Sequence, residues 1–153
     1  MKEKMHFEIV IHAPVHKVWD TMLAQETYRE WTSAFDPTSC YEGSWDKGSK
    51  IKFLSSTSGN GMVSEIAENT PYQFVSIRHL GEIQNGVEDT TSERVQKWSP
   101  AYENYTFTDK GAETLLEVDM EMPGTPEAKA VKEMFEGMWP KALLQLKEIC
   151  ENN

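Results

Sequence analysis

The segment 124–153 constrains the fold most, because it carries the longest amphipathic pattern in the sequence. Apolar residues recur in it at steps of three and four, which is the period of a helix with one apolar face. They are Val131, Phe135, Met138, Trp139, Ala142, Leu143, Leu146, Ile149 and Cys150. Thr125 suits the N-cap and Pro126 the first turn, since an N–H there would have no partner. Such a helix needs a large apolar surface to pack against.

Pro140 lies inside this helical pattern. Proline removes a backbone donor and crowds the carbonyl oxygen of Glu136, so we expect a kink here. The part of the helix beyond the kink is predicted to pack as core. The part before it is predicted to form a pocket wall with Met134, Phe135 and Met138.

The middle of the chain alternates between apolar and polar residues, which is the period of a β-strand. Strands are predicted at residues 5–11, 39–44, 50–55, 61–67, 72–80, 102–108 and 113–122. The last of these has one apolar face and one largely acidic face, so one side of the sheet must be covered. Turns rich in Asp, Asn and Gly separate several strands and favour antiparallel neighbours. The pattern predicts a seven-stranded antiparallel meander.

Helices are predicted at two further places. Two short helices, at residues 15–23 and 25–31, follow the first strand. The connection 81–101 is too long for a hairpin loop, and a capping box indicates a short helix near residues 92–98. This connection is either a lid over a cavity or a surface segment whose Trp98 covers the edge of the core.

Composition excludes several classes of protein. With 153 residues, of which 39% are hydrophobic, the chain suits one globular domain, residues 1–153. Its net charge of −10 repels nucleic-acid phosphates, so no nucleic-acid partner is expected. No apolar stretch reaches the roughly eighteen residues of a membrane span, and no secretion signal is present. We therefore expect a cytoplasmic protein, with Cys40 and Cys150 as reduced core thiols.

Short motifs near both ends carry a family resemblance. They are Ile11 and Ala13-Pro14 followed by Val18-Trp19 and Trp31, then residues 102–107, then Gly137-Met138-Trp139-Pro140 with the leucine-rich residues 143–147. The first group resembles the opening of the START-like, or SRPBCC, superfamily. The others resemble the branch named for activators of the heat-shock-protein-90 ATPase. The likeness runs in matching order from about residue 5 to 150.

This resemblance implies an α+β helix-grip fold, in which a curved seven-stranded antiparallel sheet wraps around the long C-terminal helix. It also implies a cavity between sheet and helix that binds a hydrophobic or amphipathic small molecule. Two alternatives stay open, an interaction module that acts on a chaperone and an enzyme similar to polyketide cyclases or dehydratases. The sequence leaves the ligand and the oligomeric state open.

No catalytic or metal-binding motif occurs in the sequence, so no catalytic residue, metal site or cofactor is predicted. His12 and His16 are four residues apart, but Ala13-Pro14 separates strand from helix between them. His79 lies on an alternating strand near the long connection. It is either a structural histidine or a group that faces the cavity.

The predicted ligand-binding residues are mainly aromatic and sulfur-containing side chains on the apolar faces of these elements. They are Trp31, Phe53, Met62, His79, Trp98, Tyr105, Phe107, Met120, Met134, Phe135 and Met138. Arg78 is a further candidate for orienting a ligand. Ordinary core packing explains each of them singly, whereas eight methionines in the chain favour an adaptable apolar lining.

Overall fold

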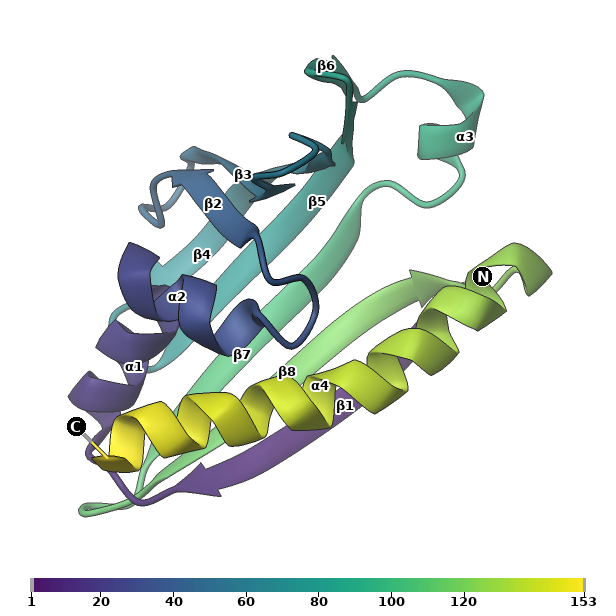
Figure 1. Ribbon diagram of the computed structural model, residues 1–153. Helices are drawn as coiled ribbons and strands as arrows, with labels where there is room; N and C mark the ends of the chain where they lie inside the picture. Colours follow the sequence, from purple (N-terminus) through teal and green to yellow (C-terminus); the bar gives the residue numbers. More distant parts are fainter. Residues whose placement is uncertain (1, 153) are drawn as a thin grey trace.

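The computed structural model describes residues 2–152 as a curved antiparallel sheet with a long helix across one face (Figure 1). The elements are β1 (Lys2–Ile11), α1 (Val15–Leu23), α2 (Gln25–Thr32), β2 (Ser39–Gly43), β3 (Lys50–Ser55), β4 (Gly61–Thr70), β5 (Phe74–Gln84), β6 (Val87–Asp89), α3 (Glu93–Gln96), β7 (Ala101–Asp109), β8 (Thr114–Pro123) and α4 (Pro126–Asn152). The strands lie in the order β1-β8-β7-β5-β4-β3-β2, and β6 pairs with β5. The predicted α+β helix-grip fold is confirmed.

In strand β8 the alternation of the sequence determines which side chains are buried in the core. Its residues alternate between buried and more exposed positions along the whole strand. Leu116 and Val118 are completely buried, and the acidic residues between the apolar ones lie on the other face. The predicted apolar face of this strand therefore forms part of the core.

The sheet contains one strand more than predicted. Strand β5 continues to Gln84, beyond the predicted end at residue 80, and turns back into β6 at Asn85-Gly86. Both turn residues have positive φ angles, 53° and 78°. A two-residue hairpin loop requires such angles to match the right-handed twist of its strands. Asn-Gly is the strongest short hairpin signal in a sequence, so reading residues 81–101 as one connection was wrong. At its other end β5 starts at Phe74, because Tyr72 lies in a turn with positive φ.

Helix α3 is shorter than predicted but begins as the sequence indicated. Ser92 is its N-cap, and the Ser92 hydroxyl accepts a hydrogen bond from the backbone N–H of Val95 at 3.3 Å. The helix then ends at Gln96. Together with β6 it lies at the end of the sheet that also carries the N-terminal half of α4 (Figure 1).

Helix α4 starts where its capping residues predicted. The Thr125 side chain accepts a hydrogen bond from the backbone N–H of Ala128 at 3.3 Å, and Pro126 is the first helical residue. Pro140 lies inside the helix without dividing it. All buried residues of α4 lie at or beyond Trp139, whereas Val131 and Met134 are 40% and 47% exposed. Packing therefore holds the C-terminal half much more firmly than the N-terminal half.

Helices α1 and α2 complete the core around the C-terminal half of α4 (Figure 1). Trp31 of α2 is buried, and its indole N–H donates to the carbonyl oxygen of Met22 in α1 at 3.0 Å. Its ring lies 5.9 Å from that of Trp139 in α4. This bond and ring contact fix α2 against both helices.

Both cysteines, Cys40 and Cys150, are buried and free, as predicted. Burial raises the pKa of the Cys150 thiol, as expected for a cysteine that acts as a small apolar core residue. None of the helices within residues 2–152 is long and apolar enough to cross a membrane.

Two leucines of α4 test the division between its buried and exposed sides. Leu146 is completely buried, whereas Leu144 is 53% exposed. We expect Leu146→Ala to lower the free energy of unfolding by about 2–5 kcal/mol, because it leaves a cavity in the core. The control Leu144→Ala should change it by less than about 0.5 kcal/mol. Urea unfolding followed by circular dichroism measures both, and equal losses would contradict this assignment of the two faces.

Candidate functional site

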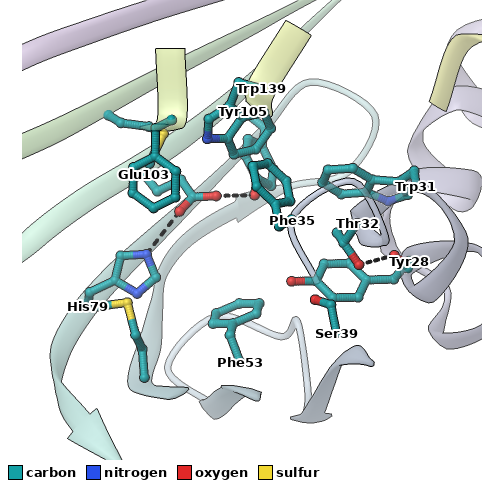
Figure 2. Close-up of a pocket in the computed structure, with 13 residues that line it drawn as sticks. Tyr28, Trp31, Thr32, Phe35, Ser39, Phe53, His79, Glu103, Tyr105 and Trp139 are labelled. Carbon is teal, nitrogen blue, oxygen red and sulfur yellow. Dashed lines mark hydrogen bonds and ion pairs between the residues drawn. The ribbon is translucent and has the colours of Figure 1, made fainter. Parts of the chain in front are cut away.

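A cavity of about 180 Å³ lies between the sheet, α2 and the middle of α4 (Figure 2). Its wall is mostly aromatic, with a few polar groups on the sheet side. The lining residues are Tyr28, Trp31, Thr32, Phe35, Ser39, Phe53, Met62, His79, Glu103, Tyr105, Met120, Phe135 and Trp139. Side chains from the sheet, from α2 and from α4 together surround it.

A groove of about 390 Å³ adjoins this cavity beneath the N-terminal half of α4. The two spaces share wall residues, namely Met62, His79, Glu103, Met120 and Phe135. The groove is further lined by Glu82, Trp98, Ala101, Tyr102, Glu121, Met122, Pro123, Ala128 and Val131. The groove thus leads from the loosely packed half of α4 to the inner cavity.

Strand register places three polar side chains in one row across the sheet. Ser64 of β4 is paired directly with His79 of β5. Glu103 of β7 is paired with Ile77, so His79 is its diagonal neighbour two residues further along β5. Tyr105 lies two residues beyond Glu103 and therefore shares its face of the sheet.

These four residues form one hydrogen-bonded network, of which Figure 2 shows the bonds from Glu103 to His79 and to Tyr105. His79 Nδ1 lies 2.7 Å from the Ser64 hydroxyl oxygen, and His79 Nε2 lies 3.0 Å from Glu103 Oε1. The Tyr105 hydroxyl donates to Glu103 Oε2. A tautomer with the proton on Nε2 satisfies both histidine contacts, since Ser64 then donates to Nδ1. Both ring nitrogens are engaged, so His79 is a fixed wall group rather than a free base.

The hydrogen bonds that join Ser64, His79 and Glu103 follow the order of nucleophile, base and acid in a hydrolase triad. The surroundings of Ser64, however, are not those of a nucleophile. Ser64 has no exposed surface and lines neither the cavity nor the groove. A ligand in the cavity meets Glu103 and the edge of His79 instead. The hydrogen bond from Ser64 to Nδ1 therefore fixes the orientation of the His79 ring.

Two tyrosine hydroxyls in the cavity remain protonated. Burial, together with the nearby Glu103 carboxylate, raises the pKa of Tyr105 well above its ordinary value. Burial and the same carboxylate raise the pKa of Tyr28, whose hydroxyl is also within hydrogen-bonding reach of the Ser39 side chain. Both hydroxyls therefore act as hydrogen-bond donors, and Glu103 is the anionic group of the cavity.

The structure brings most of the predicted binding residues to these two spaces. Trp31, Phe53, Met62, His79, Tyr105, Met120 and Phe135 line the inner cavity. Trp98 lines the groove, where its indole N–H donates to Glu82 at 3.3 Å. That these residues contact a ligand stays a prediction.

Four residues were placed wrongly by the sequence analysis. Phe107 is a buried core residue whose ring lies 5.0 Å from that of Trp19, away from the cavity. Met134 is exposed and Met138 is only half-buried, and neither lines the cavity or the groove. Arg78 alternates with His79 along β5, so it points to the opposite face, where it pairs with Glu65 at 3.1 Å.

Several wall residues were not predicted from the sequence, and Glu103 and Trp139 matter most among them. Glu103 has the same parity as Tyr105 on β7, so the period of two could have placed it on the inner face. Trp139 was assigned to the helix stripe but not to the pocket. Its ring lies 5.0 Å from that of Phe35 and 6.3 Å from that of Tyr105, and it covers one side of the cavity.

One cluster on the outer face has the composition of a metal site. Ligand atoms of His6, Glu8 and Glu117 lie within 4.8 Å of one another. Hydrogen bonds to Asp119 and Glu8 raise the pKa of His6. The two ring nitrogens of His6 lie 2.6 Å from Asp119 and 2.9 Å from Glu8, so both are already engaged by carboxylates.

Residues 12–151 match the family described as Activator of Hsp90 ATPase homolog 1-like protein. The chain belongs to this family. The match confirms the resemblance and covers every element of the fold except β1 and the last residue of α4. No curated protein matches the sequence.

Solved structures share the fold of this activator-family chain at low sequence identity. Protein MLL2253 from Mesorhizobium loti superposes with a TM-score of 0.73 at 14% identity, over 99% of this chain and 98% of that one. The Aha1 dimer from Colwellia psychrerythraea gives 0.71 at 17%, over 97% and 96%. CalU16 from Micromonospora echinospora gives 0.62 at 14%, over 95% and 76%. At these identities the likeness concerns the fold.

The buried tyrosines predict an alkaline loss of stability. In the unfolded chain tyrosine ionises near pH 10, whereas folded Tyr28 and Tyr105 keep their protons. Above that pH the unfolded state has fewer bound protons, so the free energy of unfolding falls as pH rises. Each tyrosine contributes a slope of at most about 1.4 kcal/mol per pH unit. We expect Tyr105→Phe to reduce the slope measured by urea unfolding between pH 10 and 11, and an unchanged slope would contradict the assignment.

Proposed function

We propose that this protein binds a hydrophobic or amphipathic small molecule in the cavity between its sheet and α4, with the groove as the path of entry. The observation that supports this most is the wall itself. Trp31, Phe35, Phe53 and Trp139 provide apolar surface, and Glu103 provides a fixed polar group on one side. An apolar pocket with a few convergent polar groups is the usual form of a small-molecule site. A cytoplasmic location is part of this proposal.

The sizes of the two spaces define the shape of the ligand. The inner cavity, at about 180 Å³, is smaller than most drug-sized binding pockets, whereas the groove has about 390 Å³. We infer that a compact head group enters the cavity and that a more apolar body lies in the groove. Phe135 contributes to both walls, so it contacts the ligand at the junction.

The loose packing of the N-terminal half of α4 supports entry at this end. No residue of α4 before Trp139 is buried, and the Lys132 ammonium pairs with Glu3 of β1 at 2.8 Å near the start of the helix. An exposed ion pair contributes little stability. Small displacements of this half of α4 therefore open the groove at low energetic cost.

Two neighbouring residues of α4 provide the test. Phe135 lines both spaces, whereas Met134 is exposed and lines neither. A thermal-shift and native mass-spectrometry screen of lipids and aromatic compounds identifies a ligand. We expect Phe135→Ala to weaken that ligand by about tenfold or more, because buried aromatic contact is lost, and Met134→Ala to change affinity by less than about twofold. Binding that is indifferent to Phe135, or no stabilisation by any compound, would contradict the proposal.

A second candidate function is an interaction with a chaperone, as the family description suggests. The observation that favours it is the apolar surface of Val131 and Met134 on α4, which remain 40% and 47% exposed. Exposed apolar groups in one place are typical of protein contacts. Met134 lies outside the cavity and the groove, whereas Val131 also lines the groove, so the two candidate functions share part of this helix surface.

ATP turnover by a purified Hsp90 chaperone tests this second function. We expect the rate to rise on addition of the wild-type protein and the double variant Val131→Ser, Met134→Ser to lose most of the increase, since its apolar contact is removed. The control Leu144→Ser changes another exposed residue of α4 and should keep the increase. An unchanged rate with the wild-type protein argues against the interaction.

A further inference from the structure

The lysine, arginine, aspartate and glutamate side chains that line the cavity and groove are all glutamates. Their lining residues include Glu82, Glu103 and Glu121 and contain neither lysine nor arginine, within the part of the chain that the structure describes. The whole protein also carries a net charge of −10. The potential in this site therefore favours positively charged ligands and disfavours anions.

Two of the three carboxylates already have a cationic partner. Glu82 pairs with Arg94 at 2.9 Å, and Glu121 lies 3.6 Å from the ammonium group of Lys2. Both are at the groove, away from the inner cavity. Their charges are compensated by the protein itself.

Glu103 differs, because its side chain is only 14% exposed and its partners in the network are His79 and Tyr105. In the tautomer described above, both partners are neutral donors. They hold the carboxylate in place through one bond to each oxygen, and each oxygen retains a lone pair. A largely buried carboxylate next to an apolar cavity gains much from a counter-charge.

Aromatic rings surround the space in front of this carboxylate (Figure 2). Ring contacts link Phe53 to Tyr28 at 6.2 Å, Tyr28 to Trp31 at 5.4 Å and Trp31 to Trp139 at 5.9 Å. Phe35 then contacts Trp139 at 5.0 Å. Aromatic faces carry partial negative charge and attract organic cations, most strongly where water is excluded.

We propose that the cavity selects an organic cation, an ammonium group with alkyl or aryl substituents, whose charge is held between the Glu103 carboxylate and the surrounding rings. This inference rests on the proposed binding function and adds the chemical class of the head group. The apolar body of the same molecule lies in the groove. An alkylated ammonium suits the cavity better than a bare one, because it loses less hydration on entering an aromatic wall.

The alternatives are less favourable for physical reasons. A carboxylate or phosphate head group would meet Glu103 without any lysine or arginine to compensate it. A neutral apolar head group would displace water from Glu103 and leave the carboxylate without a counter-charge. A cation avoids both penalties.

Two molecules of almost the same shape test the proposal on the wild-type protein. Phenyltrimethylammonium carries a positive charge, and tert-butylbenzene is its neutral carbon analogue. We expect the cation to bind at least about tenfold more tightly, as measured by tryptophan fluorescence or by chemical-shift changes. Because the comparison uses one unaltered protein, it does not depend on whether a variant folds.

Two variants of equal charge change then identify the group responsible. Glu103→Gln removes the carboxylate but keeps its shape, and we expect it to abolish most of the preference for the cation. Glu65→Gln removes one negative charge from the same sheet, outside the cavity and groove, and should keep the preference. Far-ultraviolet circular dichroism confirms that both variants are folded.

The outcomes separate this inference from the proposed function. If tert-butylbenzene binds as tightly as the cation, the cavity is a binding site without charge selection, and only the inference is overturned. If the cation is preferred equally by the wild type and Glu103→Gln, the role of Glu103 is wrong. If neither molecule binds, the inference fails, whereas the proposed function is judged separately by the wider ligand screen with Phe135→Ala.

Discussion

The packing of the C-terminal half of α4 against the sheet, α1 and α2 is the interaction on which the rest of the structure depends. Trp139, Leu143 and Leu146 bury their side chains there. This contact fixes one end of α4 on the curved sheet, whereas the residues of α4 before Trp139 are not buried. The cavity and the groove lie between the sheet and α4, and their walls combine buried side chains such as Trp31, Tyr105 and Trp139 with the half-buried Phe135.

Strand pairing brings the polar side chains of the cavity together. Ser64, His79 and Glu103 come from three strands that are neighbours in the sheet but distant in sequence. Their hydrogen bonds hold a carboxylate against an aromatic wall and leave it without a lysine or arginine partner. A group that is fixed and poorly solvated before a ligand arrives needs little reorganisation to bind one. The family membership of the chain accounts for the fold, whereas these particular residues account for the proposed selectivity for cations.

Much of the architecture could be predicted because the signals are local. The alternation of β8, the N-cap of α4 at Thr125 and the helical period beyond Trp139 each need only neighbouring residues. The hairpin at Asn85-Gly86 was equally local and was missed, because a long connection was assumed. The wall of the cavity was only partly predictable, since Met134 and Phe135 have similar hydrophobicity and only the docking of α4 decides which of them faces inward.

The sequence by itself determined which segments are strands and helices, which faces of them are apolar and that a long helix must cover the sheet. These properties follow from periodicity and capping, which act over a few residues. Only the tertiary structure decided that Glu103 forms hydrogen bonds with His79 and Tyr105 at the wall of an aromatic cavity. This arrangement depends on the register of β5 with β7 and on the position of α4. Both are set by long-range packing and not by local preference.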